Sequence, residues 1–173
     1  GTEGSGELIN RQRLREHHFE VTYVVGRFLS EHLIRVHNAF GGDLTAAVVL
    51  GAIGQYNVRQ FYEKFRDHAS VSYQQAVEQG EYLEHLRPCN AMSVSASTGI
   101  PRETVRRKIR WLVERGWLRK TGRDKLMVTV EVARHFAEFD LETLEKFYIA
   151  SREIVRLVEK YDAQPGPAGK PRS

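Results

Sequence analysis

Basic side chains are concentrated in one short segment, between Pro101 and Lys125. That segment holds ten basic residues against three acidic ones, a local net charge of +7 in a chain whose total is +4. The rest of the chain is therefore left with −3. Attraction to a polyanion depends on local potential, so this segregation favours a phosphate-binding face. A charge run alone is usually a solvated surface, so the spacing of the surrounding residues has to decide between the two.

The residues around this segment have the pattern of two helices joined by a tight turn, at Asn90–Arg115. Asn90 is a suitable N-cap for the first helix, and Gly99 can adopt the left-handed conformation that ends it. Pro101 suits the start of the second helix, which we expect at 101–115. The sequence therefore predicts a helix-turn-helix, whose second helix would enter the major groove of DNA.

The second helix has one apolar face, formed by Val105, Ile109 and Leu112 at helical spacing. With that face inward, the polar residues lie outside, where arginine can bond guanine, glutamate can accept from cytosine and threonine can bond a phosphate. The candidate DNA contacts on this helix are Arg102, Glu103, Thr104, Arg106, Arg107 and Arg110.

A β-hairpin is predicted directly after this helix, at Trp117–Val130. Gly116 would end the helix, and the run Thr121-Gly122-Arg123-Asp124 would turn the chain between two strands. Such a hairpin can reach the adjacent minor groove or the DNA backbone. The candidate contacts on it are Arg119, Lys120, Arg123 and Lys125.

Residues Asn90–Val130 resemble the winged helix-turn-helix of bacterial transcriptional regulators, most specifically at 98–107 and 112–118. The segment is similar to the DNA-binding domains of the GntR and MarR groups, without a choice between them. A GntR protein would continue into a larger effector domain, for which the chain has no room, and long terminal helices are typical of MarR dimers. The resemblance implies a cytoplasmic, homodimeric transcription regulator that binds double-stranded DNA.

Apolar periodicity predicts three further helices, at Leu14–Phe40, Leu44–Phe65 and Leu141–Tyr161. Asp43 and Asp140 are placed to cap the last two. Gly51 and Gly54 are costly inside a helix, and we expect another helix to approach closely there.

The expected fold is mainly α, with a small β-hairpin wing and long flanking N- and C-terminal helices. The expected parts are an N-terminal dimerisation arm at 8–42, a winged helix-turn-helix domain at 43–138 with its motif core at 90–130, a C-terminal dimerisation helix at 139–161 and a disordered tail at 162–173. A two-fold dimer would hold two recognition helices about 34 Å apart, one turn of DNA. Segment 67–88 suggests only short helical turns and no function.

Other chemistry finds little support in the sequence. The seven histidines, including His17, His18, His32 and His37, show no compact metal-ligand spacing. No nucleophile-and-base set or phosphate loop is present, so we expect no enzyme and no cofactor. The single cysteine, Cys89, fits a reducing cytosol and is expected to be buried rather than redox-sensing. No apolar run reaches the length of a membrane span, and the first residues do not form a secretory signal.

Two competing hypotheses remain at this stage. The winged fold could be a protein-interaction module whose basic face meets an acidic partner, although the arginines and threonine around the groove-facing end favour DNA. A small-molecule effector could also bind among the apolar residues of 44–53, but no ligand is indicated by the sequence.

Overall fold

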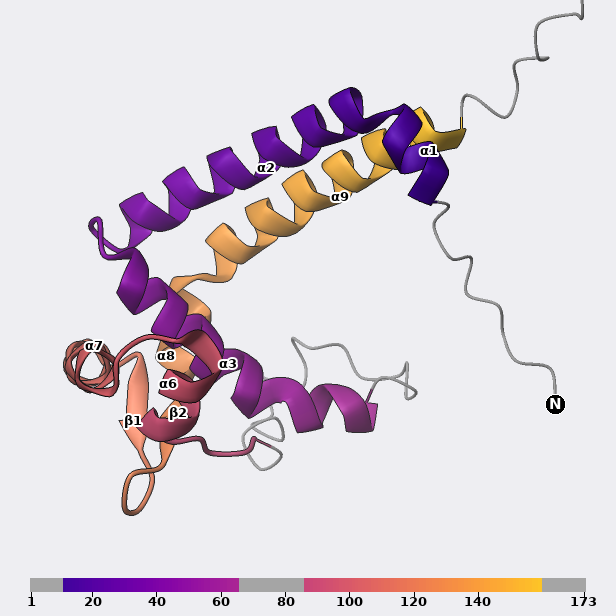
Figure 1. The fold of residues 1–173 in the computed structure, drawn as a ribbon. Coiled ribbons are helices and arrows are strands. Elements are labelled where there is room, and N and C mark those ends of the chain that lie inside the picture. The colour runs from indigo at the N-terminus through magenta and orange to yellow at the C-terminus, as the bar shows by residue number, and fades with distance from the viewer. Residues whose placement is uncertain (1–10, 66–85, 160–173) are drawn as a thin grey trace, which may run out of the picture. The chain divides into compact units, whose positions relative to one another are not determined.

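The computed structural model describes residues 11–65 and 86–159, which are mainly helical with a small two-stranded antiparallel sheet (Figure 1). The helices are α1 (Arg11–Glu16), α2 (His18–Ala39), α3 (Leu44–Phe65), α6 (Ala91–Thr98), α7 (Arg102–Glu114), α8 (Val130–His135) and α9 (Ala137–Glu159), and the strands are β1 (Leu118–Lys120) and β2 (Leu126–Val128). The chain divides into two compact units. The first combines residues 1–35 with residues 139–173, and the second consists of residues 36–138. Among the described residues, no single helix has the length and apolarity of a membrane span; only α2 and α3 taken together, across a sharp bend, do.

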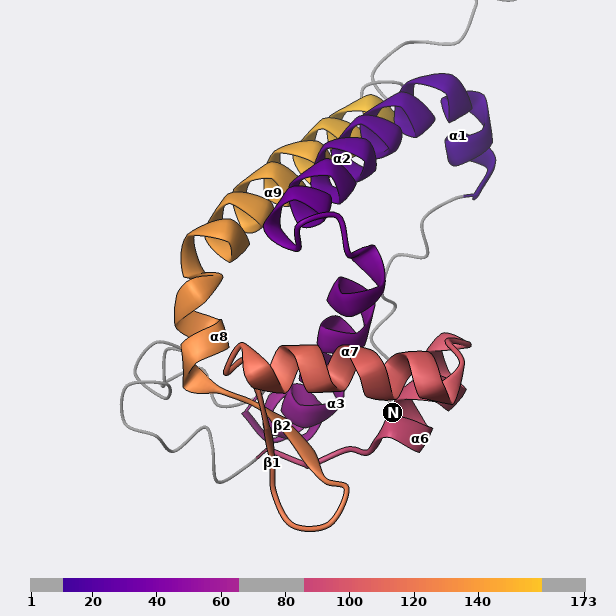
Figure 2. The same cartoon turned by 90° about the vertical axis from the view of Figure 1, so that its left-hand side faces the viewer.

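The first unit is an antiparallel pair of long helices, α2 and α9, which lie side by side in both views (Figures 1 and 2). Arg27 of α2 bonds Glu153 of α9 at 2.6 Å, whereas Arg35, two turns later, bonds Thr143 at 3.0 Å. Between the helices, Phe28 meets the edge of Phe147 with ring centroids 5.5 Å apart. The helices therefore run in opposite directions along their contact.

The ends of these helices differ from the sequence-based expectation. The region predicted as one helix from Leu14 to Phe40 is two helices, because His17 lies in a turn between α1 and α2. The last helix begins at Ala137, so the prediction of Asp140 as its N-cap was wrong. An aspartate is also favoured inside the first turn of a helix by the helix dipole, and the sequence alone does not separate the two positions.

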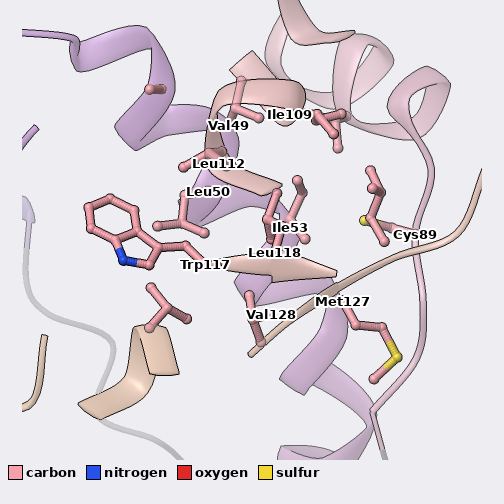
Figure 3. Close-up of a cluster of buried hydrophobic side chains, with 14 of the residues drawn as sticks. Val49, Leu50, Ile53, Cys89, Ile109, Leu112, Trp117, Leu118, Met127 and Val128 are labelled. Atoms are coloured by element: carbon pink, nitrogen blue, oxygen red, sulfur yellow. The ribbon is translucent and has the colours of Figure 1, made fainter. Parts of the chain in front are cut away.

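The second unit is built around α3, whose predicted bounds are confirmed. Asp43 accepts a hydrogen bond from the Ala46 amide at 2.9 Å, which satisfies one of the unpaired donors at the helix start. Val49 and Ile53 lie one turn apart and are both completely buried. They pack against side chains from α7, the sheet and the segment before α6 (Figure 3), which makes α3 the central packing element.

Within the described residues no other helix approaches the two glycines of α3, contrary to the expectation. A methyl group at Gly51 would meet no atom of the described residues within 4 Å. A methyl at Gly54 would lie 3.7 Å from Val128, which belongs to strand β2. Among the residues that the structure describes, Gly54 thus packs against the sheet, and Gly51 has no such neighbour.

One buried polar side chain, Asn57 of α3, ties this helix to the sheet. Its Oδ1 accepts from the Val128 amide at 2.9 Å, and its amide nitrogen donates to the carbonyl oxygens of Arg87 at 2.7 Å and Leu126 at 3.2 Å. Because Asn57 is fully buried, these bonds replace the water that its amide would otherwise bind.

The sheet pairs Leu118 with Val128 and Lys120 with Leu126, and a further bridge joins Leu126 to Cys89. The second strand ends at Val128, so the hairpin prediction, which ran to Val130, was wrong at its last two residues. Thr129 lies outside the strand, and Val130 begins α8. Thr129 caps α8 by accepting from the Val132 amide at 3.2 Å. A β-branched run is compatible with strand or helix, and the cap at Thr129 decides the outcome.

Some sequence-based expectations fall on residues outside the described ranges. These are the short helical turns expected in 67–85, the last two residues of the helix predicted to end at Tyr161 and the disordered tail at 162–173. Of the segment 67–88, the structure describes only 86–88, where Leu86 is buried in the core.

Candidate nucleic-acid interface

Helices α6 and α7 are joined by a tight turn that short-range bonds hold in place. The Asn90 side chain accepts from the Ser93 amide at 2.9 Å and caps α6. Gly99 ends α6 in the left-handed region, at φ 73°, with its amide bonded to the Ser95 carbonyl. The Ser95 hydroxyl then donates to the Ile100 carbonyl at 2.7 Å across the turn. The two predicted helices and the tight turn between them are confirmed, and α7 begins one residue after Pro101.

The apolar face of α7 holds it against the core. Val105 and Leu112 are completely buried and Ile109 nearly so. The side chains on the outside of the helix are exposed: Arg102, Glu103, Arg106, Arg107 and Arg110. Thr104 lies on the flank and is half-buried. The division between inward and outward residues is the one that the sequence predicts.

Lys108, in the middle of the basic segment, is turned back into the protein. Its ammonium nitrogen lies 2.6 Å from Oδ2 of Asp43, and both side chains are mostly covered. Burial opposes ionisation of Asp43, but the hydrogen bonds from Lys108 and the Ala46 amide outweigh it and lower the pKa of that carboxyl. Lys108 therefore fixes α7 to the start of α3, a role that the sequence pattern did not reveal.

Glu103 and Arg106 form an ion pair one turn apart on the exposed side of α7. The distance from Oε1 of Glu103 to Nη1 of Arg106 is 2.9 Å. Since 82% of the Glu103 side chain is exposed, the pair contributes little to stability. Its effect is on orientation, because it directs the Arg106 guanidinium along the helix.

Arg115 lies at the end of α7 against two tryptophans. Its guanidinium carbon lies 4.1 Å from the Trp111 ring centroid and 5.3 Å from that of Trp117. Trp117 is only 6% exposed, and it also meets the edge of Phe40 in the core. Trp117 is therefore part of the core, which leaves its ring inaccessible to a nucleotide base.

The four basic residues of the hairpin region are all exposed: Arg119, Lys120, Arg123 and Lys125. The turn between the strands contains Gly122 at φ 69° and Asp124 at φ 60°, and the Thr121 amide bonds the Lys125 carbonyl at 2.8 Å. Short polar or absent side chains suit these left-handed positions. The hairpin loop extends beyond the helices of this unit (Figure 2).

Helix α7, the start of α6 and the hairpin surround a hollow of about 500 Å³. Five of the ten predicted site residues line it: Arg102, Glu103, Arg106, Arg110 and Lys120. The lining also includes Asn90, Ala91, Met92, Ile109, Asp124 and Leu126. The other five predicted residues, which are Thr104, Arg107, Arg119, Arg123 and Lys125, are outside this lining. No sequence signal marked Met92, which is 59% exposed.

The structure offers no support for metal or thiol chemistry in the described ranges. Within 11–65 and 86–159, no three His, Cys, Asp or Glu side chains are grouped to hold a metal ion. The predicted burial of Cys89 is confirmed, at 4% exposed, and burial raises the pKa of its thiol to about 11. At neutral pH the thiol is therefore protonated and unreactive.

Comparisons with known proteins add no assignment. The chain matches no family model, no curated protein and no solved structure. The functional argument therefore rests on the residues and geometry described above.

Proposed function

We propose that residues 36–138 form a winged helix-turn-helix that binds double-stranded DNA, with α7 in the major groove and the hairpin on the minor groove or backbone. The element order supports this proposal: α3, the bridge strand at Cys89, α6, α7 and then β1 and β2. The observation that carries it is the two-sided character of α7. Its buried face fixes the helix, and its exposed face presents cations to a polyanion.

The size of α7 also suits the major groove. Its 13 residues make a helix about 20 Å long, and a helix of ordinary diameter fits a groove about 12 Å wide. The arginines of its first two turns have planar donor pairs that match either guanine O6 and N7 or the oxygens of a phosphate. Because one side of the helix carries several guanidiniums and few carboxylates, the proposal commits to DNA over an acidic protein.

The proposed active form is a homodimer assembled through α2 and α9. In each helix, exposed or small uncharged residues recur at intervals of three and four, which places them on one face. On α2 they are Phe19, Thr22, Gly26, Leu29 and Leu33, and on α9 they are Leu141, Leu144, Tyr148, Ser151 and Val155. Phe28 and Phe147 mark the contact between the two helices. We infer that both stripes lie on one side of this contact, and together they are called the α2–α9 face.

The area of this face fits a second copy of the chain. Its large apolar residues are roughly half exposed, for example Leu33 at 55% and Leu144 at 64%. At on the order of 100 Å² for each such side chain, the seven of them offer about 700 Å², close to the roughly 800 Å² that one partner contributes to a stable interface. A second α2–α9 pair has the same length and the same uncharged face, and the two pairs would close a four-helix bundle.

The ion pairs of the α2–α9 pair support this orientation. Arg27 with Glu153 and Lys146 with Glu31 lie at the other edge of the helix contact, and both pairs remain accessible to water. In the proposed dimer, the charged edge faces solvent and the uncharged face is covered, as in other helical bundles. Two copies carry two α7 helices, which suits a pseudo-palindromic operator and a transcription regulator.

The DNA-binding part is tested by titrating a fluorescent duplex pool, carrying random sequence, with the full chain. We expect binding that weakens steeply with salt, and a loss of affinity of at least tenfold in the variant Arg102→Ala/Arg106→Ala without a change in thermal unfolding. Arg59→Ala, at an exposed position of α3, removes one positive charge elsewhere and serves as the control for the effect of net charge. Equal binding by the double variant and the control would overturn the assignment of α7.

The dimer is tested by sedimentation equilibrium of two neighbouring variants. Leu33→Glu places a charge on the α2–α9 face, whereas Ile34→Glu places it 100° further around the helix at a side chain that is similarly exposed, at 61%. We expect Leu33→Glu to raise the dimer dissociation constant at least a hundredfold and Ile34→Glu to leave it near the wild-type value. A monomeric wild-type chain, or equal effects of both variants, would contradict this interface.

A further inference from the structure

We propose that the hollow between α7, α6 and the hairpin is the seat of one DNA phosphodiester strand, the one that separates the major groove from the neighbouring minor groove. This inference rests on the proposed function and assigns separate roles to residues that the sequence treats alike. The hollow is lined from both sides by cationic side chains, Arg106 and Arg110 from α7 and Lys120 from β1.

The path of the DNA backbone follows from the two contacts proposed above. A helix in the major groove and a hairpin on the adjacent minor groove lie on opposite sides of the sugar-phosphate strand between those grooves. That strand must therefore pass between α7 and the hairpin. The hollow of about 500 Å³ occupies this position and already separates the two elements before any DNA is bound.

The charges that line the hollow favour a phosphate over a base edge. Four cations, Arg102, Arg106, Arg110 and Lys120, outnumber the two carboxylates of Glu103 and Asp124. Guanidinium and ammonium groups form their strongest hydrogen bonds with anionic oxygens. Ala91 and Met92, the first residues of α6, also line the hollow, so the partial positive charge of that helix end acts in the same direction.

The remaining lining residues complement the other parts of a phosphodiester strand. Ile109, Leu126 and the exposed Met92 supply apolar surface suited to the deoxyribose carbons. Glu103 is held by Arg106 at 2.9 Å, so its carboxylate is partly neutralised. Asp124 belongs to the hairpin turn, and its carboxylate repels a phosphate. This repulsion favours a path of the DNA backbone nearer to Lys120.

This placement divides the cations of α7 into two groups. Arg106 and Arg110 line the hollow and bind phosphate, which carries no sequence information. Arg107 is exposed, lies outside the lining and is about half a turn from the buried Val105 and Ile109. Arg107 is therefore the side chain that reads base edges in the major groove.

The test compares the salt dependence of binding to two duplexes, one obtained by selection from a random library and one scrambled. For Arg110→Met and Lys120→Met we expect the slope of log K against log salt to decrease in magnitude by about 0.9 each, with equal loss of affinity on both duplexes. For Arg107→Met we expect at least a tenfold loss on the selected duplex only. Arg59→Met is the control, and thermal unfolding checks that each variant folds.

The outcomes separate this inference from the proposed function. If wild type binds neither duplex, the DNA-binding proposal fails together with the inference. In the other case, wild type binds DNA and prefers the selected duplex. If Arg110→Met and Lys120→Met then keep the wild-type salt slope, or lose affinity on the selected duplex only, the phosphate seat is wrong and the DNA-binding proposal stands. If Arg107→Met weakens both duplexes equally, the division of roles is wrong.

Discussion

The ammonium of Lys108 and the carboxylate of Asp43 lie 2.6 Å apart and join the middle of α7 to the first turn of α3. Asp43 also caps α3 through the Ala46 amide. One carboxylate thus sets the start of the central helix and the rotation of the helix that presents the arginines. Lys108 is a positioning residue, and its neighbours Arg106, Arg107 and Arg110 point outward because this side of α7 is fixed.

A double-mutant cycle with Lys108→Met and Asp43→Asn measures this pair. We expect a coupling free energy of about 1–2 kcal/mol in urea unfolding at pH 7. The pKa of Asp43 is lowered in the folded state, so its stabilising contribution is present above the ordinary pKa of 3.8 and is lost as the pH falls through the folded pKa. Coupling that is absent at pH 7, or that persists unchanged at strongly acidic pH, would contradict this role.

Asn57→Leu tests the buried amide that joins α3 to the sheet. The substitution keeps the branching at Cγ but leaves the Val128 amide and the Arg87 carbonyl without this partner, whereas the Leu126 carbonyl keeps its bond from the Cys89 amide. We expect the free energy of unfolding to fall by about 2–4 kcal/mol, from the cost of unsatisfied buried groups. Gln55→Leu, at an exposed position of the same helix, is the control, and an equal effect of both would show that the bonds of Asn57 contribute nothing particular.

Two glycine substitutions are expected to have opposite signs. Gly51→Ala adds a methyl group at a position of α3 where no described atom lies within 4 Å. It should stabilise the protein by about 0.5–1 kcal/mol. Gly99→Ala forces an L side chain to φ 73° in the turn before α7 and should destabilise it by about 1–2 kcal/mol. Denaturant unfolding measures both, and a destabilising Gly51→Ala would mean that a neighbour covers this helix face.

The thiol of Cys89 should be protected in the folded protein. Burial raises its pKa from 9.0 to about 11, so the stability that this group contributes is complete below pH 9 and is lost as the pH rises towards 11. We expect reaction with a disulfide reagent at pH 8 to be at least a hundredfold slower than in denaturant. A folded protein that reacts as fast as the unfolded chain would place the thiol at the surface.

Local signals predicted the elements that present the candidate site. Asn90, Gly99 and Pro101 act on their immediate neighbours, and the cap, the left-handed residue and the helix start all lie where these residue types indicate. The apolar spacing of α7 likewise gave its buried face, because periodicity follows from helix geometry alone. The exposed position of its arginines follows from that face.

Long-range relationships could not be predicted in the same way. Lys108 differs from its basic neighbours only because Asp43, 65 residues away, lies beside it. The same is true of Asn57, whose partners lie 30 to 71 residues further along the chain. The hollow depends on the register of the hairpin against α7, and neither a cap nor a periodicity encodes that register.

The central claim, that α7 reads DNA, is tested most directly by selection of bound duplexes from a random library with the full wild-type chain. We predict enrichment of a motif of two related half-sites, with centres about 10 base pairs apart or a multiple of that spacing. Enrichment that disappears with Arg107→Met would tie the motif to α7. A selected pool that has the base composition of the input library and contains no shared motif would contradict the claim.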